Sequence, residues 1–134
     1  MNTTTDYTKQ AQDFLTKTGV KCSIKYKEYG KHFDDDKEKR NIYRVTLRKG
    51  KNSYSFNFGD SIARTQRGAK PNEYDVLVCL TKYEPGTFEN FCGDFGYDTD
   101  SRRAEKTYKA VLKEYAEVCR IWTEAERAEL AEIN

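Results

Sequence analysis

The sequence has few of the residues from which catalytic and metal sites are built. It holds one histidine, His32, and four cysteines that lie far apart, with no Cys-x-x-Cys pair. Zinc needs clustered Cys or His ligands, so we expect no metal site. A Ser-His-Asp order, a nucleophile elbow and a phosphate-binding glycine loop are all missing. We therefore expect neither an enzyme nor a bound cofactor.

Long hydrophobic runs are missing as well. No stretch approaches the roughly 18 consecutive apolar residues of a membrane-spanning helix. Residues 1–20 contain no apolar segment typical of a secretory signal. We expect a cytoplasmic protein that does not enter a membrane. In that reducing compartment the cysteines would be small buried hydrophobes, and the apolar helical surroundings of Cys79 and Cys92 predict core positions.

Charge is abundant but unevenly distributed. Residues 39–70 carry nine Lys or Arg and one acid, Asp60, for a net charge of +8. Residues 71–134 carry eight basic and fourteen acidic side chains, a net charge of −6, while residues 1–38 balance at seven of each. Charge distribution governs association more than it governs fold. The sequence therefore indicates a binding surface.

Three segments in the first half alternate apolar and polar residues. They start at Cys22, Tyr43 and Tyr54, and their apolar side chains fall at every second position. This period is typical of half-buried strands. The last two segments are joined by residues 49–52, a predicted hairpin turn with Gly50 available for a positive φ. The sequence predicts a three-stranded antiparallel meander.

Helical spacing marks the two ends of the chain. Residues 6–18 predict an amphipathic helix that Gly19 ends. After Pro71 the spacing predicts about four helices, of which the first stops near Tyr83. The predicted capping residues of the later helices are Thr87, the cluster 98–101, and Thr123 with Glu126 as a capping box.

These elements predict an α+β fold in one domain. Residues 1–70 would form a helix and the antiparallel sheet, and residues 71–134 a helical bundle. If the aromatic residues of the strands face the core, basic side chains share the opposite face. Same-face residues of a strand lie about 7 Å apart, close to the spacing of successive phosphates in a nucleic-acid strand. The basic loop 64–70 would extend this surface.

The residues predicted to bind a partner are Lys25, Lys27, Arg44, Arg48, Arg64, Arg67 and Lys70. The structural alternative is a solvated face whose cations prevent edge pairing and aggregation. A second, acidic surface is predicted in the helical half. Its residues are Asp94, Asp98, Glu105, Glu114 and Glu117. Helix capping is the preferred interpretation of residues 94–100, because the spacing of a calcium-binding loop is missing. Asp34, Asp35 and Asp36 predict a solvated loop tip.

The run YEPGTFENFCGDFGYDTDS at residues 83–101, followed by Ala104, Tyr108, Val111 and Trp122, resembles a module in small uncharacterised proteins of bacteriophages and other mobile elements. The resemblance covers the C-terminal part alone and carries no site residues. It implies a small, non-enzymatic phage protein of the kind that includes anti-CRISPR proteins, acting in the cytoplasm of a bacterial host.

Charge and resemblance together lead to one main hypothesis. The chain would bind a bacterial defence protein or ribonucleoprotein, a CRISPR effector first, and inhibit it by occluding a surface. The alternative is a protein of phage replication or regulation that binds DNA or RNA directly. A third possibility is a small enzyme with a pocket that gathers His32 or the aspartates. The oligomeric state stays open.

Overall fold

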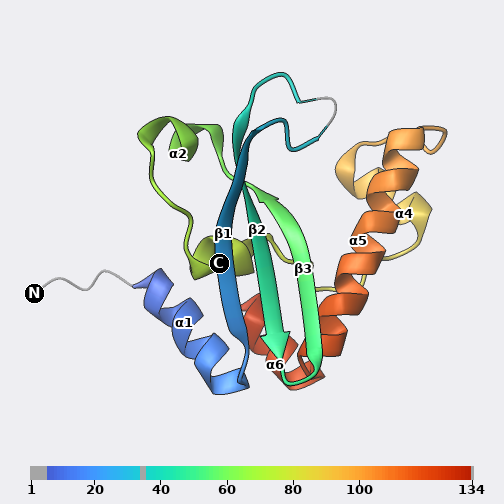
Figure 1. Cartoon of the computed structure of the whole chain (residues 1–134). Helices are drawn as coiled ribbons and strands as arrows, with labels where there is room; N and C mark the ends of the chain where they lie inside the picture. Colours follow the sequence, from blue (N-terminus) through green and yellow to red (C-terminus); the bar gives the residue numbers. More distant parts are fainter. Residues whose placement is uncertain (1–5, 34–35, 134) are drawn as a thin grey trace, which may run out of the picture. The chain divides into compact units, whose positions relative to one another are not determined.

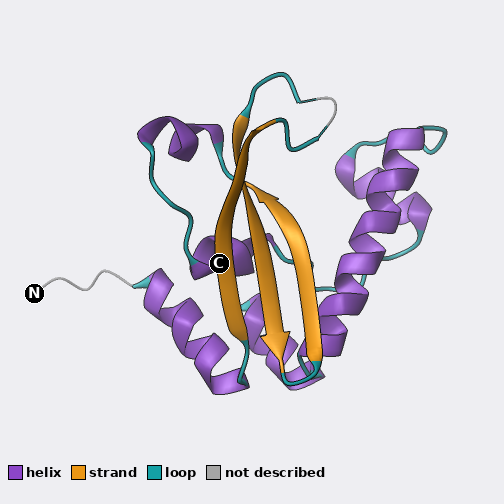
Figure 2. Cartoon of the chain, viewed as in Figure 1, coloured by secondary structure: helices purple, strands orange, loops and turns teal. Residues whose placement is uncertain are grey.

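The computed structural model describes residues 6–33 and 36–133 and has an α+β fold (Figures 1 and 2). The elements are α1 (Tyr7–Thr18), β1 (Lys21–Gly30), β2 (Arg40–Lys49), β3 (Asn52–Gly59), α2 (Ile62–Arg67), α3 (Glu73–Cys79), α4 (Phe88–Phe95), α5 (Arg102–Ile121) and α6 (Glu124–Ala131). The chain divides into two compact units. The first runs to Cys79 and includes Ile133, and the second is Leu80–Glu132. That the two make one domain stays a prediction.

The first unit contains the predicted meander. Its strands pair antiparallel in the order β1-β2-β3. In the hairpin between β2 and β3, Lys49 pairs with Asn52 across a two-residue turn. Gly50, the first turn residue, has a positive φ of 57°, and Lys51, the second, does not have a positive φ. This combination is that of a type II′ turn. The predicted turn is confirmed.

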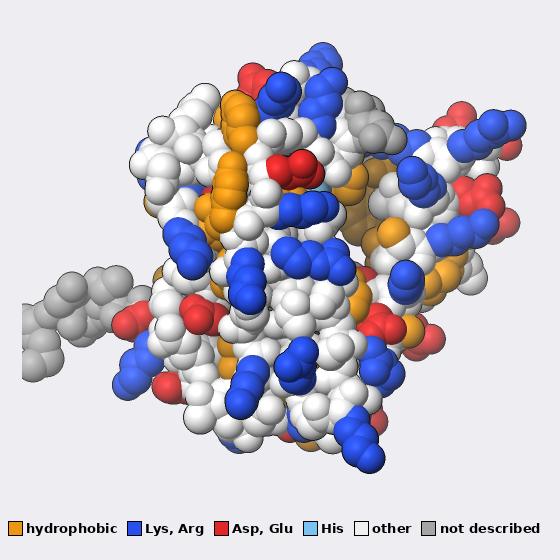
Figure 3. Space-filling view, in the orientation of Figure 1, with side chains coloured by type: hydrophobic (Ala, Val, Ile, Leu, Met, Phe, Trp, Pro, Cys, Tyr) orange, Lys and Arg blue, Asp and Glu red, His pale blue; other side chains and the backbone are white. Residues whose placement is uncertain are grey.

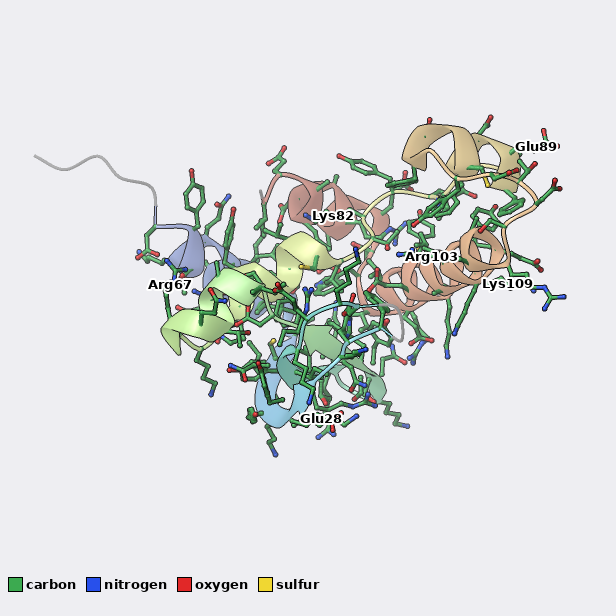
Figure 4. The ribbon with its side chains drawn as sticks, turned by 90° about the horizontal axis from the view of Figure 1, so that it is seen from above. Glu28, Arg67, Lys82, Glu89, Arg103 and Lys109 are labelled. Carbon is green, nitrogen blue, oxygen red and sulfur yellow. The ribbon has the colours of Figure 1, made fainter. Side chains whose placement is uncertain are left out.

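The strands bury one face. Tyr43, Val45, Leu47 and Phe58 are buried, as the alternation predicts. Figures 1 and 4 show α1 and α3 together behind the sheet, so the other face of the strands carries neither helix. Asp6 caps α1 by accepting a hydrogen bond from the backbone N–H of Lys9, and Gly19 ends the helix in the left-handed conformation. The predicted first helix is confirmed.

The predicted basic loop 64–70 is wrong in its first half, because Ile62–Arg67 form the short helix α2. The side chain of Ser61 accepts a hydrogen bond from the backbone N–H of Arg64, and Gly68 ends the helix with a φ of 71°. A cap residue and a terminating glycine thus enclose a single short helical segment. Such a segment is too short to show a helical period in the sequence.

The second unit is helical. Thr87, Ser101 and Thr123 cap α4, α5 and α6 as predicted, and the capping box of Thr123 with Glu126 is present. Phe91, Cys92 and Ala104 form a buried cluster. Four helices are found after residue 70, as predicted, but the first of them ends at Cys79 and not near Tyr83, and one bundle of four is not confirmed. The first of them, α3, packs against α1 in the first unit.

The four cysteines differ in burial. Cys92 is buried as predicted, but Cys79 is exposed, so the prediction of a core position for Cys79 is wrong. The reason is the helical period of α3, which buries Val76 and Leu77 and turns the next two residues outward. Burial, with the nearby Glu73 carboxylate as a smaller cause, raises the pKa of the Cys22 thiol to about 12. None of the described helices is long and apolar enough to span a bilayer.

Candidate functional site: a basic sheet face

Strand pairing places four basic side chains in two like-charge pairs. Lys25 lies directly opposite Arg44, and Lys21 lies directly opposite Arg48. All four residues are exposed. Within residues 6–33 and 36–133, none of the four forms an ion pair with a carboxylate. Like charges directly opposite each other in a sheet are destabilising. The pairing therefore concentrates positive charge at a cost in stability.

A row of hydroxyl groups lies between the two pairs. Ser23 is opposite Thr46 on one side, and Ser55 is opposite Thr46 on the other. The hydroxyls of Thr46 and Ser55 are 2.9 Å apart and hydrogen-bonded. All three side chains are half-buried. The centre of the face is therefore neutral and low, with hydrogen-bonding groups across all three strands.

On β3 this surface ends at Asn57, which forms a hydrogen bond with Arg44. Nη1 of Arg44 donates a hydrogen bond of 3.1 Å to the side-chain oxygen of Asn57. This contact leaves the other guanidinium N–H groups of Arg44 available on the exposed side. We call these residues the basic face, and they are Lys21, Ser23, Lys25, Arg44, Thr46, Arg48, Ser55 and Asn57.

The two cationic pairs stand at a fixed separation. Arg44 and Arg48 are four residues apart on β2, which corresponds to about 13 Å along the strand. Figure 3 shows the sheet from this side, with Lys and Arg side chains above and below a band of uncharged atoms. Arg, Lys, Ser, Thr and Asn side chains are those from which phosphate-binding surfaces are built. The face can therefore bind a ligand that carries several anionic groups along its length.

Lys27 does not lie in the basic face as predicted, and Lys21, which was not predicted, does. The pairing of β1 with β2 shifts between Tyr26 and Glu28, which leaves Lys27 in a bulge. Its Nζ lies 3.9 Å from Oε1 of Glu28. Glu28 is exposed and lies opposite Ile42, two residues before Arg44 on β2, so its carboxylate borders the basic face. The predicted alternating segment starts at Cys22, one residue after the strand begins, and so does not include Lys21. Lys21 precedes Lys25 by four residues, so an extended strand places both side chains on the same face, and this spacing could have identified Lys21 from the sequence.

Arg64 is already bound by its own chain. Its Nη1 lies 3.1 Å from Oδ1 of Asp60 and 2.8 Å from Oδ2 of Asp75, and its Nη2 donates a 2.9 Å hydrogen bond to Oδ1 of Asp75. The Asp60 side chain is only 1% exposed. A buried carboxylate needs such a counterion. Arg64 thus ties α2 to α3, and we leave it out of the basic face.

The structure does not bring Arg67 and Lys70 into the basic face. Both are exposed, Arg67 as the last residue of α2 and Lys70 in the segment that follows. Figure 4 shows Arg67 at the periphery of the first unit, apart from Glu28 on β1. The predicted partner contacts of these two residues stay predictions. They extend the positive charge of the first unit without sharing the flat surface of the sheet.

The predicted acidic residues all lie in the second unit, and most already have partners. Glu105 pairs with Lys109 at 2.9 Å, and Glu117 pairs with Arg120. Glu114 accepts hydrogen bonds from the backbone N–H and the hydroxyl of Thr81. Asp98 accepts from the backbone N–H of Asp100, and Asp94 is exposed on α4. Asp34 and Asp35 fall outside the described residues. Asp94, Asp98 and Glu105 are exposed, and the role of the acidic surface in binding a partner stays a prediction.

One hollow of the first unit has a volume of about 280 Å³. It is lined by Tyr29, Glu38, Lys39, Ile62, Thr65 and Gln66. The hydroxyl oxygen of Thr65 accepts a hydrogen bond from the backbone N–H of Asn41, so its hydroxyl has a structural role. The lining offers one acid and one base but no activated nucleophile. This composition gives the hollow no chemistry that competes with the basic face.

The functional interpretation rests on the geometry of the basic face. Among residues 6–33 and 36–133, no three His, Cys, Asp or Glu side chains are grouped so that they could hold a metal ion. The resemblance of the C-terminal part to phage proteins stays a prediction. Comparison of the chain with protein-family models, with curated proteins and with solved structures gives no match.

Proposed function

We propose that the chain is a non-enzymatic binding protein that docks its basic face on an anionic surface of a larger complex and blocks that surface. The observation that carries the proposal is the pairing of Lys25 with Arg44 and of Lys21 with Arg48. None of these four side chains forms an ion pair with a carboxylate of the described residues. The repulsion within each pair lowers the stability of the unbound protein. An anionic partner removes this repulsion.

The resemblance to small phage proteins supports a bacterial defence complex as the partner, with a CRISPR effector as the first candidate. Such effectors hold an RNA–DNA heteroduplex in a channel and displace a single DNA strand, so they present nucleic acid as well as protein. The basic face would inhibit by occupying an anionic surface that the effector needs. No covalent step is involved.

The second candidate is direct binding of DNA or RNA in phage replication or regulation. The observation that favours it is the hydroxyl row of Ser23, Thr46 and Ser55 between the two cationic pairs. Hydroxyl side chains donate to phosphate oxygens in many nucleic-acid complexes. This function would require no effector.

A matched pair of variants tests the proposal. Arg44→Glu/Arg48→Glu reverses two charges on the basic face, and Lys106→Glu/Lys113→Glu reverses two exposed charges on α5. Each protein is added in increasing ratio to purified CRISPR effectors, and target cleavage is measured. We expect the wild type and the α5 variant to inhibit one effector stoichiometrically, while the basic-face variant does not.

Two results would decide against inhibition. If the wild type binds naked nucleic acid but inhibits no effector, direct nucleic-acid binding is the better function. If the basic-face variant inhibits as well as the wild type while circular dichroism shows both folded, the basic face is not the binding site.

A further inference from the structure

We infer that the ligand of the basic face is the sugar–phosphate backbone of a duplex nucleic acid, bound without reading its bases. This inference rests on the proposed function, because it assigns the anion at the same face. The first support is chemical. The exposed groups are ammonium, guanidinium, hydroxyl and amide groups, which are the groups that contact phosphate and sugar.

The second support is regularity. The two cationic pairs are related by the strand repeat, with Arg44 and Arg48 about 13 Å apart along β2. A duplex offers charges at a constant repeat, one per roughly 1.7 Å of its axis, wherever it is contacted. An acidic protein surface offers carboxylates at irregular positions. Two cationic pairs held one strand interval apart on the same sheet match the first ligand better.

The third support is the position of the aromatic residues, which lie on the other side of the sheet. Tyr54 and Phe56 stack on each other with ring centroids 5.0 Å apart, and Tyr43 is buried. The exposed Tyr26 packs edge-on against Tyr43 at 5.6 Å. Proteins that hold single strands stack the bases on aromatic rings. The basic face offers no ring, which favours a duplex over a single strand.

The fourth support is the low centre of the face. Base pairs are read by side chains or elements that enter a groove. The three residues between the cationic pairs carry only the short side chains of Ser23, Thr46 and Ser55, and they are half-buried. Their hydroxyls reach the backbone of a duplex but not the base edges. The binding is therefore independent of sequence.

The test measures fluorescence anisotropy of a labelled DNA duplex against added protein, at salt concentrations from roughly 50 to 200 mM. If the four cations of the face each neutralise one phosphate, the slope of log K against log salt is about −3.6. Arg44→Gln/Arg48→Gln should reduce the slope to about −1.8. Lys106→Gln/Lys113→Gln on α5 should leave the slope unchanged.

Four further probes separate the possible ligands: an RNA duplex, a second DNA duplex of unrelated sequence, the single strand of the first duplex, and poly-glutamate. We expect the two DNA duplexes to bind equally and the single strand to bind more weakly. The RNA duplex should bind through the same face, with the same loss in the Arg44→Gln/Arg48→Gln variant.

Contrary results are distinguishable. Tight binding of poly-glutamate without duplex binding overturns the inference and leaves the proposed function standing. A tighter complex with the single strand overturns the choice of duplex. If none of these probes binds at the lowest salt, the inference fails, and the effector-inhibition assay decides the proposed function separately. If Lys106→Gln/Lys113→Gln reduces the salt slope as much as Arg44→Gln/Arg48→Gln does, the basic face is not the binding site.

Discussion

The imidazole of His32 lies against the backbone of Gly59, the last residue of β3. A Cβ atom built on Gly59 would come within 2.5 Å of Cγ of His32. The loop after β1 is therefore held against the end of β3 by a contact that only glycine permits. Burial lowers the pKa of His32, with Arg40 acting in the same direction and Asp36 opposing it.

Replacement of Gly59 by Ala should destabilise the protein by about 1–3 kcal/mol, because the added methyl group must displace the imidazole. Urea denaturation followed by circular dichroism measures the change. Gly93→Ala in α4 is the matched control, since a Cβ atom there meets nothing within 4 Å. We expect the control to be neutral or stabilising, as Ala is the better helix former. A Cβ atom on Gly59 would also lie 2.8 Å from Cβ of His32, so the test of the collision uses His32→Gly. If Gly59→Ala costs as much stability in a His32→Gly background as in the wild type, the collision is not the cause.

The stability of the protein should fall in mild acid because of His32. Its pKa in the folded state lies below the ordinary value of 6.5, so the folded state binds the proton more weakly than the unfolded state. The resulting stabilisation is complete above pH 6.5 and is lost as the pH falls through the folded pKa. We expect the free energy of unfolding of the wild type, relative to His32→Gln, to decrease between about pH 7.5 and pH 5. A constant difference over this range would contradict the prediction.

Arg64→Met should destabilise the protein by about 3 kcal/mol, because the buried Asp60 and the nearby Asp75 lose their shared counterion. Arg67→Met removes an equal charge from the exposed end of the same helix, and its effect should stay within about 0.5 kcal/mol. Thermal melting distinguishes the two variants. Equal melting temperatures would show that the Arg64 contacts carry no stability. At temperatures where Arg64→Met is folded, it should bind the duplex as the wild type does.

Arg44→Glu should stabilise the sheet while it weakens binding. The change turns the like-charge pair of Lys25 and Arg44 into an opposite-charge pair, which contributes roughly 0.2–1 kcal/mol. The control is Lys25→Glu/Arg44→Glu, which restores repulsion with two negative charges. Denaturation at low salt should place the single variant above both the wild type and the double variant, and added salt should reduce the difference. A single variant that is no more stable than the wild type at low salt would show that repulsion between Lys25 and Arg44 does not lower the stability of the sheet by more than the Arg44–Asn57 hydrogen bond contributes.

Local signals in the sequence predicted much of the fold. Thr87, Ser101 and Thr123 cap helices because a short side chain and a following apolar period act within a few residues of each other. The alternation at Tyr43, Val45 and Leu47 predicted the buried face of the sheet for the same reason. These patterns need no knowledge of the rest of the chain.

The details of the candidate site depend on contacts between distant residues. Arg64 contacts Asp75 because α2 and α3 pack together, and no pattern in the sequence predicts that ion pair. The opposition of Lys25 and Arg44 depends on the register of β1, which the bulge at Lys27 interrupts. A shift by one residue turns each side chain to the other face. The sequence therefore predicted that basic side chains share one face of the sheet, but it did not predict which of them lie opposite each other.

The like-charge pairs also affect how the protein should be handled and how long it should last. Any ligand that binds the folded chain and not the unfolded chain raises the melting temperature with its concentration. A preparation stripped of polyanions would thus be the least heat-resistant form, and phosphate or sulfate buffers would protect it in part. In a cell, the fraction of chains lost to proteolysis would then follow the occupancy of the sheet.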